Sequence, residues 1–396
     1  MTALASPSEA GLRVLLPTTA GEVRDALLDT AGSRPRIGVR GTGTADAWAT
    51  PAGPVDVEVD AEVATTELRG VLRYNPADMT MAVRAGTPLA EVQEEVGRHG
   101  QRVAFDPARA ALGATVGGLL ATADGGPARH AQGTLRDLVI GVTVVLGDGT
   151  VARSGGHVIK NVAGYDLAKL FSGSFGTLGV VAEVVLRLHP LPRASATVAV
   201  PVEPAQAHDV GDRIVGAGLE PSALELCDDR LLVRFDGTPE GVARRAKAVA
   251  AAVERPVQEA ADTDWATVAA TALGEPGDTV LRLGTLPSAG PGTLAALPTA
   301  GLDTALSSTV MSGVHTLRLR GGSPAAHAEV LRAAHAAVGP ACTVLRRDGL
   351  PADAPAWGPP PRSVAVLRAV KQRFDPTGRF PAARLAPWLD PEGVRA

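Results

Sequence analysis

The chain has 396 residues, a formal net charge of −4 and an aromatic content of only 3%. A chain of this length can form two domains with sizeable cores. Its mixed charges and few aromatic rings argue against a nucleic-acid-binding protein, which needs clustered cations and rings that stack on bases. No apolar run reaches the roughly 18–20 residues needed to cross a bilayer, so direct membrane insertion is not expected.

The first half of the chain predicts short strands and helices mixed together. A helix is expected over residues 20–30, and alternation of apolar and polar residues predicts strands over residues 36–40, 55–59 and 79–84. Thr87 can cap a further helix that extends to Gly100, with Pro88 in its first turn. Gly147-Asp148-Gly149 separates two strand-like runs, which indicates a hairpin.

Residues 196–350 differ in character, because glycine-rich motifs become rare and strand-like runs alternate with Ala-rich helical runs. Strands are expected near residues 197–202, 231–235, 280–283 and 315–320, and helices over residues 239–253 and 324–338. A proline-dense connector follows from residue 351, and a last helix is expected over residues 363–374. We therefore expect a second α/β domain without ligand-binding loops of its own, and we find no internal repeat.

Three glycine-rich loops stand out in the first 195 residues. They are Arg40-Gly41-Thr42-Gly43-Thr44, the stretch from Asp106 to Gly126, and the turn from Gly173 to Gly179. Glycine lets the backbone approach a ligand closely, and the N–H groups of such turns can bind an anion. The first loop lacks the third glycine and the βαβ context of a Rossmann site. A structural turn explains one such loop, whereas three together favour a large ligand with phosphates at one end and a planar group at the other.

A short segment concentrates residue types that the chain otherwise avoids. One of its two Asn, one of its two Tyr and two of its four Lys lie within ten residues, at Lys160, Asn161, Tyr165 and Lys169. Lys160, Asn161 and Tyr165 are therefore candidate catalytic residues, which could bind a substrate carboxylate or stabilise developing negative charge. The alternative is that Asn161 and Tyr165 brace their own loop.

These motifs make residues 1–195 similar to the FAD-binding domain of the vanillyl-alcohol oxidase/PCMH flavoprotein superfamily. The resemblance runs through the first glycine loop, residues 78–87, Ala114-Thr115-Val116-Gly117-Gly118, Gly133 with Asp137-Leu138-Val139, and Gly176-Thr177-Leu178-Gly179. Within that superfamily, residues 74–78, 160–167 and 371–376 resemble the FAD-binding E subunit of bacterial glycolate oxidase. Where the family's tail usually has an Asn-Pro-Gly step, this chain has Phe380-Pro381-Ala382-Ala383.

The resemblance implies an α+β fold in three parts. Residues 1–195 would form a PCMH-type FAD-binding domain of two subdomains, residues 196–350 a smaller α/β cap or substrate domain, and residues 351–396 a proline-rich connector, helix and tail that return to the FAD domain. Many relatives attach the flavin through a histidine in the first loop, and residues 1–98 contain none, so non-covalent FAD is implied. The implied FAD contacts are Arg40, Gly41, Thr42, Gly43, Thr44, Pro107, Thr115, Gly117, Gly118, Thr122, Gly126, Gly133, Gly179 and Val180.

No metal site is expected in this chain. The sister subunit of the family that oxidises hydroxy acids carries a metal-binding histidine pair, and none of the eight histidines here stands in such a context. We interpret His327 and His335 as packed or solvent-facing side chains. Cys227 and Cys342 are too few to hold an iron–sulfur cluster, and we expect them to act as small hydrophobic residues in a core.

The resemblance finally implies an FAD-dependent oxidoreductase acting on CH–OH donors. In this hypothesis the chain is the FAD-binding subunit of a glycolate oxidase-type complex, which oxidises a small 2-hydroxy acid such as glycolate to glyoxylate with a sister flavoprotein subunit and an iron–sulfur subunit as partners. The missing histidine pair implies that oxidation occurs mainly in the sister subunit. Two alternatives are a stand-alone hydroxy-acid or alcohol dehydrogenase or oxidase, and a non-catalytic flavin-binding assembly subunit. A cytoplasmic location, with any membrane association through partners, is expected.

Overall fold

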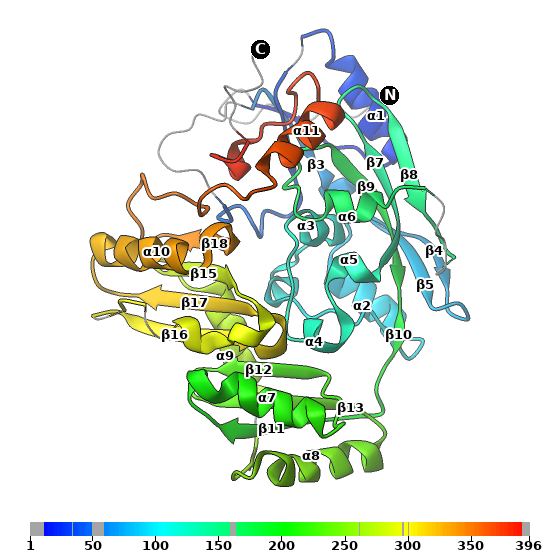
Figure 1. Ribbon diagram of the computed structural model, residues 1–396. Helices are drawn as coiled ribbons and strands as arrows, with labels where there is room; N and C mark the ends of the chain where they lie inside the picture. The colour runs from blue at the N-terminus through cyan, green and yellow to red at the C-terminus, as the bar shows by residue number, and fades with distance from the viewer. Residues whose placement is uncertain are drawn as a thin grey trace.

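The computed structural model describes residues 12–33, 35–49, 59–158, 164–260, 262–294, 297–299 and 301–389. These residues form an amino-terminal domain with two subdomains, a second domain built on one large sheet, and a carboxy-terminal segment that lies against the first domain (Figure 1). The α+β class expected from the sequence is confirmed. Among the described residues, no helix is both long enough and apolar enough to cross a bilayer.

The first subdomain is a small parallel sheet with one helix. Its strands are β1 (Arg13–Leu15), β3 (Ala61–Ala64) and β2 (Ile37–Arg40), with β3 in the centre. Helix α1 (Ala20–Asp29) begins where the Thr19 side chain accepts a hydrogen bond from the Glu22 N–H, and it buries Val23 and Leu27, four residues apart, against the sheet. The predicted helix and strand 36–40 are confirmed, whereas the predicted strand 55–59 lies almost wholly outside the described residues.

The second subdomain contains an antiparallel sheet in the order β4-β5-β9-β7-β8. Its strands are β4 (Val71–Asn75), β5 (Thr80–Arg84), β9 (Val180–Arg187), β7 (Val139–Val145) and β8 (Val151–Gly155). Its helices are α2 (Leu89–Gly97), α3 (Val116–Ala121), α4 (Arg129–Gln132), α5 (Leu135–Leu138) and α6 (Leu167–Phe171). The hairpin of β7 and β8 is confirmed. Pro88 rather than Thr87 is the N-cap of α2, because the Thr87 hydroxyl donates instead to the Arg84 carbonyl.

The second domain is an eight-stranded sheet, here called the cap sheet, with every pairing antiparallel. The chain reaches it through β10 (His189–Pro190), which pairs with β6 (Gln101–Arg102). The strands lie in the order β14-β11-β13-β12-β16-β17-β15-β18. They are β11 (Ala194–Pro201), β12 (Ala223–Cys227), β13 (Arg230–Gly237), β14 (Gln258–Glu259), β15 (Thr279–Gly284), β16 (Asp303–Thr309), β17 (Val314–Arg320) and β18 (Cys342–Arg347).

The cap sheet repeats one strand order twice. The run β11 to β14 pairs in the order β14-β11-β13-β12, and the run β15 to β18 pairs in the mirrored order β16-β17-β15-β18, so the two halves join at β12 and β16. No repeat is visible in the amino-acid sequence, so the repetition lies in the order of the strands. The helices are α7 (Ala207–Gly216), α8 (Pro239–Val253), α9 (Asp262–Leu273) and α10 (Pro324–Val338).

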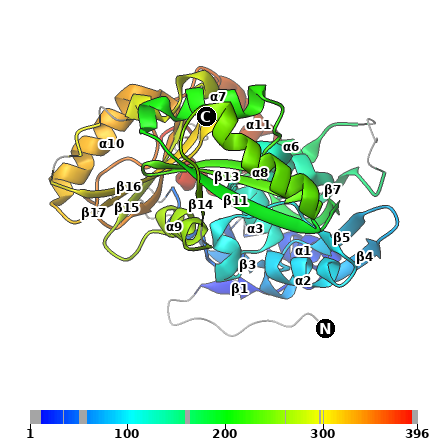
Figure 2. The same cartoon turned by 90° about the horizontal axis from the view of Figure 1, so that it is seen from below.

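Alternate side chains of the cap sheet face opposite layers. Leu231 and Val233 pack with α7 and α8, whereas Leu232 between them packs with Val268 and Trp265 of α9. Helix α10 covers the same outer face as α7 and α8, and α9 lies on the inner face toward the amino-terminal domain (Figure 2). The inner face of the cap sheet therefore faces the amino-terminal domain.

The carboxy-terminal segment is held by buried charged side chains. In α11 (Val364–Phe374), Lys371 donates to the Thr177 carbonyl at 2.8 Å and forms an ion pair with Asp375. The Arg379 guanidinium donates to the Leu27 carbonyl at 2.9 Å and to the Thr30 hydroxyl at 2.7 Å. These contacts join the segment to both subdomains of the amino-terminal domain.

Candidate functional site

One cavity lies in the amino-terminal domain and another lies between the two domains, and Arg109 lines both. The smaller, about 90 Å³, is here called the cradle cavity; it is formed by the loop after β2, the start of α3, the turn before β9 and Arg384 of the carboxy-terminal segment. The larger, about 290 Å³, is here called the interface cavity; it lies between the amino-terminal domain, α9 and the inner face of the cap sheet.

The cradle cavity exists because glycines leave space beside the backbone. A Cβ atom at Gly41 would stand 2.8 Å from the Thr115 hydroxyl, and one at Gly117 would stand 2.7 Å from the Ala85 Cβ. The buried Ser174 hydroxyl, which lines this cavity, has no hydrogen-bond partner among the described residues. A narrow space with bare backbone and a free hydroxyl fits an extended ligand that supplies polar oxygens.

Positive charge surrounds the cradle cavity. Arg40, Arg109 and Arg384 line it together with a single carboxylate, Asp46. Arg40 forms an ion pair with Asp46 at 2.6 Å, and this hydrogen bond raises the pKa of Arg40. Arg384 donates to the Ala45 carbonyl at 3.0 Å, and burial lowers its pKa. Arg109 is also paired, with Asp124 at 2.9 Å, so three guanidinium groups face two carboxylates, and this excess of positive charge suits a ligand that carries phosphates.

Most of the FAD contacts predicted from the sequence lie together. The cradle cavity is lined by Arg40, Gly41, Thr42, Gly43, Thr44, Thr115, Gly117, Gly118, Thr122 and Gly179, and the interface cavity by Gly126. Three predicted contacts line neither cavity. Pro107 precedes the turn that carries Arg109, Gly133 ends α4, and Val180 is fully buried in the core beside Phe380.

The candidate catalytic residues are not brought to these cavities. Lys160 and Asn161 lie outside the described residues. Tyr165 is 92% exposed and lines neither cavity, and its carbonyl accepts a hydrogen bond from the Ser154 hydroxyl. A catalytic role for these three residues stays a prediction.

Polar side chains from the inner face of the cap sheet complete the interface cavity. They are Glu225, Arg234, Arg282, Ser307, Thr309 and Thr316. The sequence pattern did not predict these residues as site residues, because a charged residue in an alternating strand normally faces solvent. The signal was present in Leu224-Glu225-Leu226 and Leu281-Arg282-Leu283, where the charged residue separates two leucines of the outer core. The second domain thus contributes to a cavity through a sheet face rather than through loops.

Four arginines reach the interface cavity, and their partners differ. Arg109 pairs with Asp124 at 2.9 Å and lies 4.0 Å from the Trp48 ring centroid. Arg234 pairs with Asp106 at 3.0 Å across the domain boundary. Arg282 donates to the Ala123 carbonyl at 3.1 Å, and the Arg129 guanidinium has no hydrogen bond or ion pair to any described residue. Burial lowers the pKa of Arg282 to about 10 and also lowers that of Arg129.

Glu225 is the most strongly perturbed carboxyl group of the interface cavity. Its two oxygens accept hydrogen bonds from the hydroxyls of Ser307 and Thr309, the latter at 2.8 Å. Burial raises its pKa to about 7, although both hydroxyls and the charge of Arg129 oppose the shift. The carboxyl group therefore keeps its proton to a higher pH than an ordinary glutamate does.

Comparison with known proteins gives the family context. Residues 12–155 match the model of the FAD binding domain family. Glycolate oxidase subunit GlcE of Escherichia coli is 41% identical over 127 residues, which are 32% of this chain and 36% of that protein. Glycolate oxidase subunit GlcD of Bacillus subtilis is 33% identical over 239 residues, covering 60% and 50%. A mitochondrial D-lactate dehydrogenase [cytochrome] of Saccharomyces cerevisiae is 30% identical over 166 residues, covering 42% and 28%.

The chain therefore spans no more than about half the length of these curated relatives. Among solved structures, alkyldihydroxyacetonephosphate synthase superposes with a TM-score of 0.67 at 16% identity, covering 93% of this chain and 75% of that one. This likeness supports the fold of two subdomains followed by a cap. Residues 12–155 match the FAD binding domain family, and FAD is the cofactor that the glycine-walled, arginine-rimmed cradle would fit.

Proposed function

We propose that this chain is an FAD-dependent oxidoreductase that oxidises a small 2-hydroxy acid, glycolate foremost, within a complex containing a second flavoprotein subunit and an iron–sulfur subunit. The observation that carries the proposal is the arginine-lined interface cavity, which shares Arg109 with the cradle cavity. Similarity to two glycolate oxidase subunits and to a D-lactate dehydrogenase supports the substrate class.

The two cavities divide the work between cofactor and substrate. FAD, when bound, supplies the acceptor for the hydrogen and two electrons that leave the substrate carbon. The cradle residues would hold the phosphates through Arg40, Arg384 and bare backbone. The cap sheet forms one wall of the interface cavity, where a substrate carboxylate would meet partly buried guanidinium groups.

The iron–sulfur partner is proposed because onward one-electron transfer requires a carrier. Cys342 is fully buried and Cys227 partly buried, and burial raises the pKa of each thiol to about 12, so both behave as packing residues. Among the described residues, no group of three or more His, Cys, Asp or Glu side chains could hold a metal ion. A cluster would then belong to another polypeptide in a cytoplasmic complex.

Anaerobic reduction of the flavin tests the proposal. The chain is purified alone and co-expressed with candidate partner subunits, and its visible flavin absorbance is followed after addition of glycolate or D-lactate. Bleaching of this chain's flavin in the complex is expected. Bleaching of the isolated chain would favour the stand-alone enzyme, and an intact complex whose flavin in this chain never bleaches would favour the assembly subunit.

A further inference from the structure

The interface cavity holds one carboxyl group, that of Glu225, and two guanidinium groups, those of Arg129 and Arg282, that form no ion pair with any described residue. Asp106 and Asp124 are bound by Arg234 and Arg109. Arg129 forms no ion pair with any described residue, although the charges of Glu225, Asp124 and Asp106 act on it. Glu225 is held only by two neutral hydroxyls. A partly buried guanidinium without a carboxylate partner can bind an anion.

The fold places Arg129 and Glu225 on opposite walls of the same cavity. Arg129 begins α4, and its guanidinium lies over Gly125, where a Cβ atom would stand 1.7 Å from Nη2. Helix α4 packs against β12, which carries Glu225 on its inner face. Thr309 is the register partner of Glu225 on β16, and Ser307 lies two residues away on the same face. The carboxyl group is thus fixed from the cap side and the cation from the amino-terminal side.

This inference rests on the proposed function. We propose that Arg129 and Glu225 handle the substrate in this chain: the Arg129 guanidinium binds the carboxylate of a small 2-hydroxy acid, and the Glu225 carboxylate accepts the proton of its hydroxyl group. Arg282, which donates to the Ala123 carbonyl and lies 5.1 Å from the Trp48 ring centroid, adds a second positive charge to the carboxylate site. Oxidation would then occur at this chain's own flavin site without the histidine pair of the sister subunit.

The proposed step balances with FAD as the oxidant. The substrate O–H bond breaks and its proton moves to a Glu225 oxygen. The C2–H bond breaks as the hydrogen leaves with two electrons to FAD, and the C2–O bond becomes a carbonyl. The substrate is oxidised to a 2-oxo acid, FAD is reduced, and the Glu225 proton is later released to solvent.

The acidity of the buried carboxyl group suits this task. An ordinary glutamate is a weak base, whereas a group whose pKa is near 7 combines ionisation at neutral pH with a useful affinity for the proton. The charged groups that face Glu225 are Arg129 and Asp106 from the amino-terminal domain, and the remaining charges of the cavity are Asp124, Arg109, Arg234 and Arg282.

Oxalate, an unreactive dicarboxylate, separates binding from oxidation. Its affinity for the FAD-loaded complex is measured from the perturbation of the flavin visible spectrum, and the rate of anaerobic flavin reduction by glycolate is measured in parallel. Arg129→Met is expected to weaken oxalate binding about 10- to 100-fold, because a charged hydrogen bond is lost. Glu225→Gln should keep the oxalate affinity and slow flavin reduction about 10²- to 10⁴-fold. Arg98→Met, in an exposed ion pair on α2, is the matched control and should change neither.

A second variant tests the proton acceptor without removing it. Thr309→Val deletes one hydroxyl that stabilises the Glu225 carboxylate, so the pH midpoint of flavin reduction should move upward from about 7. A carboxyl infrared band that titrates near that pH and is absent from Glu225→Gln provides a readout without substrate turnover.

The outcomes separate this inference from the proposed function. Suppose that glycolate reduces the wild-type flavin. If Arg129→Met then binds oxalate normally, or if the flavin of Glu225→Gln is reduced at the wild-type rate, the inference fails and the proposed function stands. If Arg129→Met loses FAD while the remaining holoprotein binds oxalate normally, Arg129 holds the cofactor and the inference fails. If neither glycolate nor D-lactate reduces the wild-type flavin in the complex, the proposed function fails and the role of Glu225 fails with it.

Discussion

Gly43 shows how single residues shape the cradle cavity. Its φ is +77°, a left-handed conformation that strains other residues, and a Cβ atom there would stand 2.7 Å from Arg40 Nη2 and 2.8 Å from Asp46 Oδ2. The ion pair that orients Arg40 therefore depends on the absence of a side chain at this position. Gly97, on the last turn of α2, is a useful contrast, because a Cβ atom there meets nothing within 4 Å.

We expect Gly43→Ala to lose FAD and Gly97→Ala to keep it. The first substitution strains the backbone and displaces the Arg40–Asp46 pair, and we expect FAD affinity to fall at least about tenfold, or about 1.4 kcal/mol. The second should leave FAD affinity unchanged and raise the free energy of unfolding by up to about 1 kcal/mol, because alanine favours helix over glycine. FAD content after purification and equilibrium titration of the apoprotein check both. Equal FAD affinity in the two variants would contradict the placement of the cofactor.

Glu225 makes stability depend on pH. Its pKa is about 7 in the folded protein against an ordinary value of 4.5, so the folded state binds the proton more tightly. The free energy of unfolding should then fall as pH rises from about 4.5 to about 7, by at most about 3 kcal/mol from this group. In Glu225→Gln this contribution is absent. The difference in unfolding free energy between variant and wild type, measured in urea at pH 5 and pH 8, should favour the variant more at pH 8; an unchanged difference would mean that the buried carboxyl group is not protonated.

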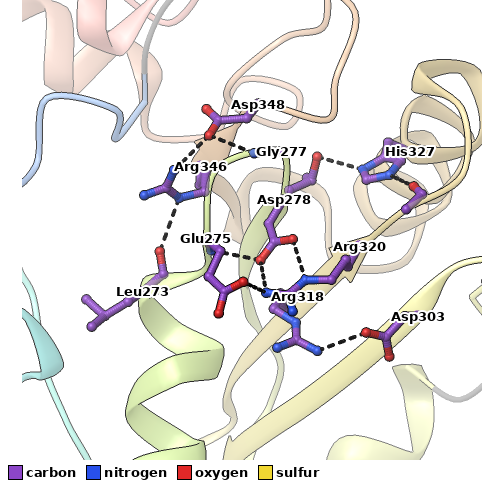
Figure 3. Close-up of polar contacts among 12 residues, drawn as sticks. Leu273, Glu275, Gly277, Asp278, Asp303, Arg318, Arg320, His327, Arg346 and Asp348 are labelled. Atoms are coloured by element: carbon purple, nitrogen blue, oxygen red, sulfur yellow. Dashed lines mark hydrogen bonds and ion pairs between the residues drawn. The ribbon is translucent and has the colours of Figure 1, made fainter.

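Elements of the cap sheet are joined at one end by a cluster around Asp278. Its carboxylate accepts two hydrogen bonds from Arg320, at 2.9 and 3.0 Å, and one from the Glu275 N–H at 2.8 Å (Figure 3). His327 of α10 bonds to the Thr279 hydroxyl at 2.8 Å beside it, which confirms that this histidine is packed. The cluster fixes β15, β17 and α10 relative to one another, so it stabilises the sheet from which Glu225 and Arg282 project.

Asp278→Asn should destabilise the cap sheet, and Asp303→Asn should not. The Asp278 side chain is 2% exposed; burial opposes its ionisation, but the Arg320 hydrogen bonds, the Glu275 N–H and the nearby arginine charges together outweigh burial and lower its pKa. Loss of the charge leaves Arg320 with Glu275, at 2.8 Å, as its remaining carboxylate partner and should cost about 1–3 kcal/mol at neutral pH. Because the folded pKa is depressed, the wild-type advantage should be complete above about pH 4 and disappear as pH falls through the folded pKa.

Asp303 is the matched control. Its side chain is 63% exposed and paired with Arg318 at 3.3 Å, so Asp303→Asn should cost less than about 1 kcal/mol. Urea unfolding at pH 7 and pH 3 distinguishes the two.

The elements show what could be predicted from the sequence. Helices α8 and α10 match their predicted bounds, because Thr238 and Ser323 cap them and proline follows each cap. The glycine-rich loops that line the cradle cavity could be located from the sequence, because each glycine requirement is local to its own turn. The order of the cap strands depends on pairings such as Glu225 with Thr309, 84 residues apart in the chain, for which no local pattern exists. The inner-face residues of the interface cavity were therefore missed.

The whole molecule brings three distant parts of the chain to two adjoining cavities. The amino-terminal domain supplies the cradle loops, the carboxy-terminal segment supplies Arg384, and the cap sheet forms one wall of the interface cavity. The domains are also joined directly by the ion pairs Arg102–Asp236 at 2.9 Å and Arg234–Asp106 at 3.0 Å. A ligand that fills both cavities would contact all three parts, so its binding energy should stabilise them together.

FAD should therefore stabilise the cap as well as the domain that holds it. At a free FAD concentration of 100 times its Kd, the free energy of unfolding should rise by about 2.7 kcal/mol. Urea unfolding of apoprotein and holoprotein can be followed by far-ultraviolet circular dichroism for the whole chain and by the fluorescence of a variant that keeps only Trp265, which lies on α9 in the cap. Both signals should shift together to higher urea with FAD, and Gly43→Ala should show a smaller shift at the same FAD concentration. If the Trp265 transition has the same midpoint with and without FAD, the cap unfolds independently of the cofactor, and the interface cavity is not an extension of the cofactor site.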